Sequence, residues 1–134
     1  MIDDSLLLIE KRNPPIMFNF EKLEVWKKSI DLADAIYSVT RAFPIEERFG
    51  LTNQLRRAAV SVSSNIAEGS SRRSKTDFAR FIEIATGSVL ELTSQAFIAR
   101  RQGFLSEGNF EKIYRDAQEI GRMLSGLKSS LTTE

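Results

Sequence analysis

The sequence contains no cysteine and no histidine. Without thiols the chain forms no disulfide. Without thiolate or imidazole ligands it also lacks the common zinc sites and the Glu-x-x-His di-metal site of helical bundles. The missing imidazole excludes the base of a serine hydrolase triad, and the missing thiol excludes a cysteine nucleophile. These two absences remove most of the common enzyme classes.

Long apolar runs are also missing. No run approaches the roughly 20 residues that a helix needs to span a bilayer. The apolar residues 6–9 are too few for a secretory signal, and they follow Asp3 and Asp4 instead of a basic segment. We therefore expect a cytoplasmic protein that makes no membrane contact.

Neither sign of charge dominates the chain, whose net charge is +1. The basic residues are nevertheless concentrated in residues 41–80, which hold eight basic and four acidic side chains. The chain is therefore no polycation, and any electrostatic contact with nucleic acid is expected to be local.

Proline is scarce, at positions 14, 15 and 44 only, and helical periodicity runs through nearly everything after residue 20. The pattern predicts four helices, at about 21–42, 51–69, 75–102 and 107–131. Because their connections are short, the expected fold is an all-α, antiparallel up-down-up-down four-helix bundle. We expect an N-terminal extension at 1–19 and a four-helix bundle domain at 20–134.

Several residues predict how these helices begin, end and pack. Pro44 should end the first helix just before it, and Gly69 should end the second as a C-terminal glycine. Ser74 followed by Asp77 three residues later resembles a capping box at the start of the third helix. Gly87, inside that helix, is expected to permit close packing.

The first and third predicted helices carry more apolar surface than one core needs. The first helix has two apolar stripes, which indicates either deep burial or a subunit interface. On the third helix, two large apolar residues align seven positions apart on an otherwise outer face. The candidate oligomer-interface residues are Val25, Leu32, Ile36, Val39, Leu90 and Phe97.

The second predicted helix has a continuous polar ladder beside its core stripe. Its members recur at i+3 and i+4 spacing and are Gln54, Arg57, Ser61, Asn65 and Glu68, with Glu91 of the third helix as a further candidate. Buried polar groups must be paired, so we expect a network that fixes how helices and subunits fit together. The alternatives are a solvated face and a ligand or catalytic pocket.

A basic corner precedes the third helix. Arg72, Arg73 and Lys75 lie beside its predicted N-terminus, where free backbone N–H groups and the helix dipole favour phosphate. They are candidate nucleic-acid-binding residues. A contact made this way should depend little on the nucleotide sequence and should weaken as the salt concentration rises. No aromatic residue is interleaved with them, so base stacking is not predicted here. The alternative is a solvated loop.

Several segments of the sequence resemble those of one protein family. They are Phe20 to Trp26 (FEKLEVW), Phe43-Pro44 with Glu47, residues 50–62 (GLTNQLRRAAVSV), 65–69 (NIAEG) and 84–92 (IATGSVLEL). They are similar to the 23S rRNA intervening-sequence proteins, a four-helix-bundle family, over about residues 20–130. The resemblance implies a small bacterial protein that forms a homopentameric ring. It also implies nucleic-acid binding by association, because relatives are encoded in 23S rRNA genes and a similar fold serves diversity-generating retroelements.

We therefore expect a non-enzymatic, oligomeric bundle, pentameric by the family resemblance. It would bind rRNA or other RNA or DNA through the basic corner repeated around the ring. The second hypothesis is an oligomeric scaffold or protein-interaction module without nucleic-acid binding. The third is an enzyme with carboxylate chemistry, but Glu68, Glu83 and Glu91 are not paired at catalytic spacing. No cofactor, metal or small-molecule substrate is expected.

Overall fold

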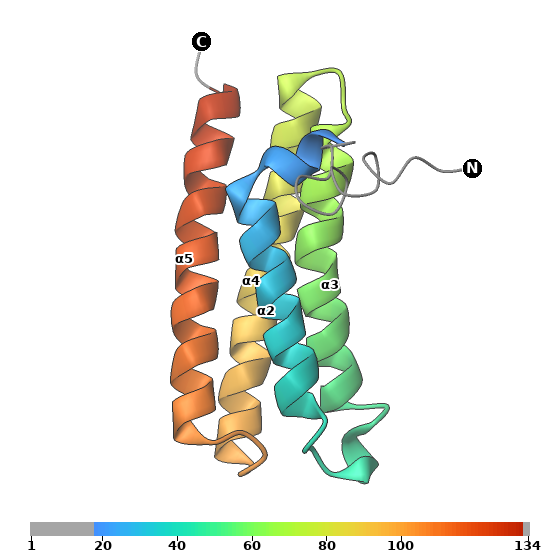
Figure 1. Cartoon of the computed structure of the whole chain (residues 1–134), viewed down its shortest axis with the longest axis vertical. Coiled ribbons are helices and arrows are strands. Elements are labelled where there is room, and N and C mark those ends of the chain that lie inside the picture. Colours follow the sequence, from blue (N-terminus) through green and yellow to red (C-terminus); the bar gives the residue numbers. More distant parts are fainter. Residues whose placement is uncertain (1–17, 133–134) are drawn as a thin grey trace, which may run out of the picture.

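The computed structural model describes residues 18–132. Their helical segments, in chain order, are η1 (Asn19–Lys22), α2 (Glu24–Thr40), η2 (Ile45–Glu47), α3 (Leu51–Ser70), α4 (Lys75–Arg101) and α5 (Glu107–Thr132). The four long helices lie side by side and alternate in direction (Figure 1). The prediction of an all-α, antiparallel four-helix bundle is confirmed. Of the expected extension, residues 1–17 lie outside the described part of the chain.

Each long helix packs against two others, and α2 closes the bundle against α3 and α5. The centre is filled by aliphatic side chains that recur at three- and four-residue spacing along each helix, as one-sided burial requires. The largest fully buried ones are Leu32, Ile36, Leu55, Ile66, Ile82, Leu92, Ile113, Ile120 and Leu124. Burial of this size is the main source of stability for a domain of this length.

The helix ends follow local chemistry. Ser74 Oγ accepts a hydrogen bond from the backbone N–H of Asp77 at 3.0 Å, which confirms one half of the capping box predicted for α4. The Asp77 carboxylate, which would complete the box, pairs instead with Arg80 at 3.2 Å. The first predicted helix is shorter than expected, because Leu23 is extended (φ −83°, ψ 119°) and separates η1 from α2. α2 ends at Thr40, and residues 41–43 turn the chain before Pro44.

α3 ends at Ser70, within a residue of the predicted end, but Gly69 is not its C-terminal glycine, because Gly69 lies inside the helix and does not have a positive φ. A Cβ atom at this position would lie 2.7 Å from Phe81 Cβ and 2.9 Å from Phe78 Cδ1. Gly69 therefore allows α3 and α4 to approach closely. The opposite holds for Gly87, where a Cβ atom would meet nothing within 4 Å, so this glycine does not permit close packing within the chain.

The expected interface on the first helix also needs correction. Val25, Leu32 and Ile36 are buried in the core of this chain, and Val39 packs against that core. The burial of the first three side chains leaves none of them available to a second subunit.

Two polar residues interrupt the buried apolar face of α2. Ser29 and Thr40 lie on the same buried face of α2, where they look out of place in an apolar stripe. Their hydroxyl groups donate to carbonyls of the same helix, Ser29 Oγ to Trp26 O at 2.6 Å and Thr40 Oγ1 to Ile36 O at 2.7 Å. Both hydroxyl hydrogens are therefore satisfied within α2, and Thr40 Oγ1 also accepts a hydrogen bond from Arg56 Nε of α3 at 2.9 Å.

Candidate functional site

The middle of the polar ladder joins α3 to α4. Ser61 Oγ lies 2.8 Å from Ser88 Oγ across the two helices. Asn65 Nδ2 donates to the carbonyl and to the hydroxyl of Ser61, at 2.8 and 3.1 Å. These three half-buried or buried residues form a paired network in the α3–α4 seam, as buried polar groups require.

A second part of the network depends on Gln95, which sequence reasoning missed. This side chain is 7% exposed, and its Nε2 donates to Gln54 Oε1 at 3.4 Å and to Glu91 Oε1 at 3.2 Å. Its own Oε1 is buried without a hydrogen-bond partner among the described residues. The available signal was its spacing, since Gln95 follows Glu91 by four residues and Ser88 by seven, on the edge of the core stripe.

Two expected members of the ladder do not join this network. Arg57 is exposed and makes no hydrogen bond or ion pair within residues 18–132. Glu68 instead pairs with Arg72, Oε1 to Nη2 at 2.8 Å, on the surface. The structure thus brings Gln54, Ser61, Asn65 and Glu91 into two hydrogen-bonded groups. A role for the ladder in fitting subunits together stays a prediction.

A polar groove of about 360 Å³ lies over the first half of this seam. Asn53, Gln54, Arg57, Ala58, Ser61 and Glu91 line it. It contains one guanidinium, one carboxylate and two amides, which recognise polar groups but supply neither a nucleophile with its base nor a paired set of carboxylates.

The basic corner is the turn between α3 and α4 together with the first residue of α4, at the top of Figure 1. Arg72, Arg73 and Lys75 are all exposed there. Arg72 pairs with Glu68 and its guanidinium lies 4.7 Å from the centre of the Phe81 ring. Arg73 and Lys75 have no hydrogen bond or ion pair in the described range, so they carry the uncompensated charge of the corner.

Of the remaining interface candidates, Leu90 is the most open. Its side chain is 67% exposed, whereas Phe97 is 40% exposed and packs against Phe110 and Tyr114 with ring centres 4.8 and 6.0 Å apart. Ile84 and Ile98 add two more exposed apolar side chains to the outer side of α4. Exposed apolar groups gathered on one helix are typical of a covered surface.

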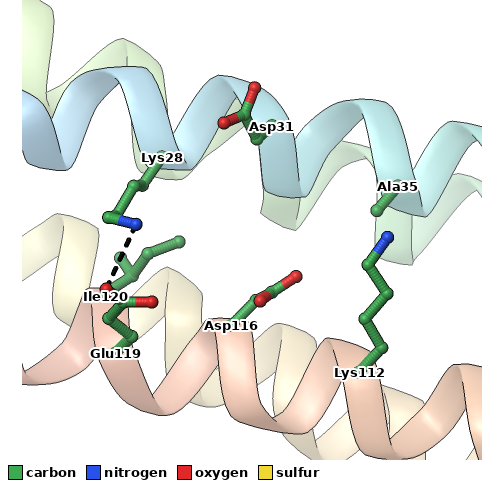
Figure 2. Close-up of a pocket in the computed structure, with 7 residues that line it drawn as sticks. All are labelled: Lys28, Asp31, Ala35, Lys112, Asp116, Glu119 and Ile120. Atoms are coloured by element: carbon green, nitrogen blue, oxygen red, sulfur yellow. Dashed lines mark ion pairs between the residues drawn. The ribbon is translucent and has the colours of Figure 1, made fainter.

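A charged seam between α2 and α5 was not singled out from the sequence (Figure 2). It encloses about 190 Å³ and is bridged by Lys28 Nζ and Glu119 Oε1 at 3.1 Å. The hydrogen bond and the charge of Glu119 raise the pKa of Lys28 above its ordinary value. Figure 2 shows Lys112 extending from α5 toward Ala35 of α2. The seam contains ion-pairing groups of both signs, which is typical of a solvated helix contact.

Within the described part of the chain, no three or more aspartate or glutamate residues are arranged to hold a metal ion. Among the helices of residues 18–132, none combines the length and the apolar character that crossing a membrane requires.

Fold and surface together define the class of protein: a four-helix bundle with a polar α3–α4 seam and a basic corner. The chain belongs to the 23S rRNA-intervening sequence protein family, which its residues 21–126 match. No curated protein matches the chain.

Among solved structures, the chain is similar to a Bacteroides thetaiotaomicron VPI-5482 protein of unknown function from the S23 ribosomal protein family. The two chains are 24% identical, with a TM-score of 0.72 over 81% of this chain and 99% of the other. This likeness supports the fold. Neither the family nor this neighbour is described as an enzyme.

Proposed function

We propose that this protein is a non-catalytic, self-associating helical bundle that contacts the phosphate backbone of rRNA or another nucleic acid through its basic corner. The observation that carries the proposal is the pair Arg73 and Lys75, both exposed and without an acidic partner in the described chain. The family name and the expected ring of five subunits support it, since a ring would repeat the corner in every subunit.

The chemistry of the corner suits phosphate more than bases. Arg73 and Lys75 supply charge, and the first turn of α4 adds the positive end of a helix dipole. The ring of Phe81 lies beneath Arg72 and is therefore not free for stacking on a base. Binding should accordingly be sequence-tolerant and weaken steeply with salt.

The test is an RNA and DNA shift titration at low and at high salt. Arg73→Gln combined with Lys75→Gln should weaken binding at low salt by at least about tenfold and reduce the salt slope by about 2 for each corner engaged. A matched control is Arg101→Gln combined with Arg122→Gln, which removes the same charge from exposed, unpaired positions elsewhere on the bundle. Equal affinity of the two double variants would overturn the proposal.

A second function is favoured by a different observation, the exposed apolar side chains Ile84, Leu90 and Ile98 on α4. A scaffold that binds other proteins would use such a face and need no nucleic acid. The same titration separates the two hypotheses, because the absence of binding at low salt would leave only the scaffold.

A further inference from the structure

A second groove lies on the other side of Arg57, toward α2. It has a volume of about 550 Å³ and is lined by Tyr37, Asn53, Arg56, Arg57, Val60 and Ser61. Its lining includes two arginines and no carboxylate. Along α3, Arg57 lies fourteen residues before Ser71, or about 21 Å, so the groove is distinct from the basic corner.

Arg56 is held in place by groups that leave its charge uncompensated. Its Nε donates to Thr40 Oγ1 at 2.9 Å, and Thr40 is itself buried and bonded to the backbone. The guanidinium carbon lies 4.7 Å from the centre of the Tyr37 ring. The terminal nitrogens of Arg56 have no hydrogen bond within the described chain, so a fixed donor edge remains for a ligand.

Arg57 adds a second charge with no partner in residues 18–132. Four described arginines pair with carboxylates, Arg72, Arg80, Arg100 and Arg115, and neither Arg56 nor Arg57 is among them. The carboxylate beside Arg57 is Glu91 of the adjoining polar groove, and it accepts a hydrogen bond from Gln95. Two neighbouring guanidinium groups without a counter-charge in their own groove give it a local positive charge that attracts an anion.

We propose that this groove binds the phosphate group of a nucleotide, either free or within a single strand. Arg56 and Arg57 would hold the phosphate oxygens, because the guanidinium fork matches phosphate geometry. Asn53 and Ser61 supply further polar contacts. Val60, 42% exposed, and the part of the Tyr37 ring that Arg56 does not cover supply apolar surface for the sugar and base.

The size of the groove agrees with this occupant, since ligand pockets usually enclose about 300–1,000 Å³. The held position of Arg56 matters as well, because a side chain that is already ordered loses less entropy when it binds. The inference does not rest on the basic corner, since the groove shares no residue with it.

The experiment measures binding to the full chain of three probes: inorganic phosphate, adenosine monophosphate, and a fluorescein-labelled single-stranded RNA. Chemical-shift perturbation follows the first two probes, and fluorescence anisotropy follows the RNA. Arg57→Gln should weaken adenosine monophosphate binding by about tenfold, the loss expected for one charge-assisted contact. Val60→Ser, which removes apolar surface without touching the contacts that hold Arg56, should weaken binding of the nucleotide and the RNA but leave inorganic phosphate unchanged.

Two controls separate this proposal from the basic corner. Arg122→Gln removes an exposed, unpaired arginine of α5 and should leave the binding of all three probes unchanged. Arg73→Gln with Lys75→Gln should weaken RNA binding but leave adenosine monophosphate binding unchanged. Arg57 makes no bond within the described chain, so its replacement should leave the unfolding transition in place, and Arg57→Lys should recover part of the affinity.

Two outcomes would overturn the inference. The first outcome is that adenosine monophosphate binds the Arg57→Gln variant as tightly as the unmodified chain, or that it binds neither protein. The second is a change of molecular mass of Arg57→Gln in light scattering, with no nucleotide affinity in the unmodified chain. This result would assign the groove to a carboxylate of a second copy.

Discussion

Gly69 of α3 and Gly87 of α4 are both helical glycines, but the first is closely surrounded and the second is not. Around Gly69, the nearest atom to an added Cβ is the Cβ of Phe81, which is tied to the backbone of α4 and cannot swing away. Around Gly87 there is open space. A glycine-to-alanine substitution at Gly87 therefore changes stability through helix propensity alone. At Gly69 the same substitution also changes the packing between α3 and α4.

Gly69→Ala should lower the free energy of unfolding by about 1–2 kcal/mol, because the overpacking of α3 against α4 outweighs the gain in helix propensity. Gly87→Ala should raise it by about 0.5–1 kcal/mol, since it gains propensity without a clash. Urea unfolding of both variants checks the pair. Equal stability of the two variants would contradict the close approach at Gly69.

At the scale of an element, α4 begins with a side-chain cap, Ser74. The hydroxyl of Ser74 satisfies the N–H of Asp77, and Asp77 in turn pairs with Arg80 at 3.2 Å. The start of α4 therefore depends on local groups and not on burial. It is also the point at which the basic corner joins the helix.

Ser74→Ala should destabilise the protein by about 1 kcal/mol, because the first turn of α4 loses its cap. Ser74→Asp should restore most of the loss, since aspartate caps as well as serine does. Ser94→Ala, at an exposed interior position of the same helix, is the matched control and should be neutral or slightly stabilising. A thermal melt of Ser74→Ala that matches the Ser94→Ala melt would count against the cap.

At the scale of the whole molecule, the outer side of α4 is the apolar surface on which self-association would depend. Leu90 is 67% exposed and lies on the same helix as the exposed Ile84 and Ile98. A second copy of the chain is the partner that the family resemblance implies. The interface would then involve Leu90 and not Val25, Leu32 or Ile36, which the core already buries.

Light scattering on a sizing column should give a multiple of the chain mass of 15.2 kDa, and five times that mass for a pentamer. Leu90→Glu should shift the mass toward the monomer, because a charge in an apolar interface is left unpaired. Gln118→Glu, at an exposed position of α5, should leave the mass unchanged. A monomeric unmodified chain would contradict self-association through this face.

The sequence by itself determined the number, type and order of the long helices. Apolar spacing marks a helix wherever one face is buried, and Pro44 and Ser74 mark ends through local chemistry that needs no distant partner. For the same reason the bounds of α3, α4 and α5 agree with prediction to within a residue.

Only the tertiary structure decided which face of each helix is occupied, and by what. Val25 became core because α2 packs against both α3 and α5. Gln95 became the hub of a network because α3 places Gln54 beside it. Arg56 became a held arginine because α2 places Thr40 and Tyr37 next to it. Such contacts join residues far apart in the chain, so helical spacing, which relates only near neighbours, does not determine them.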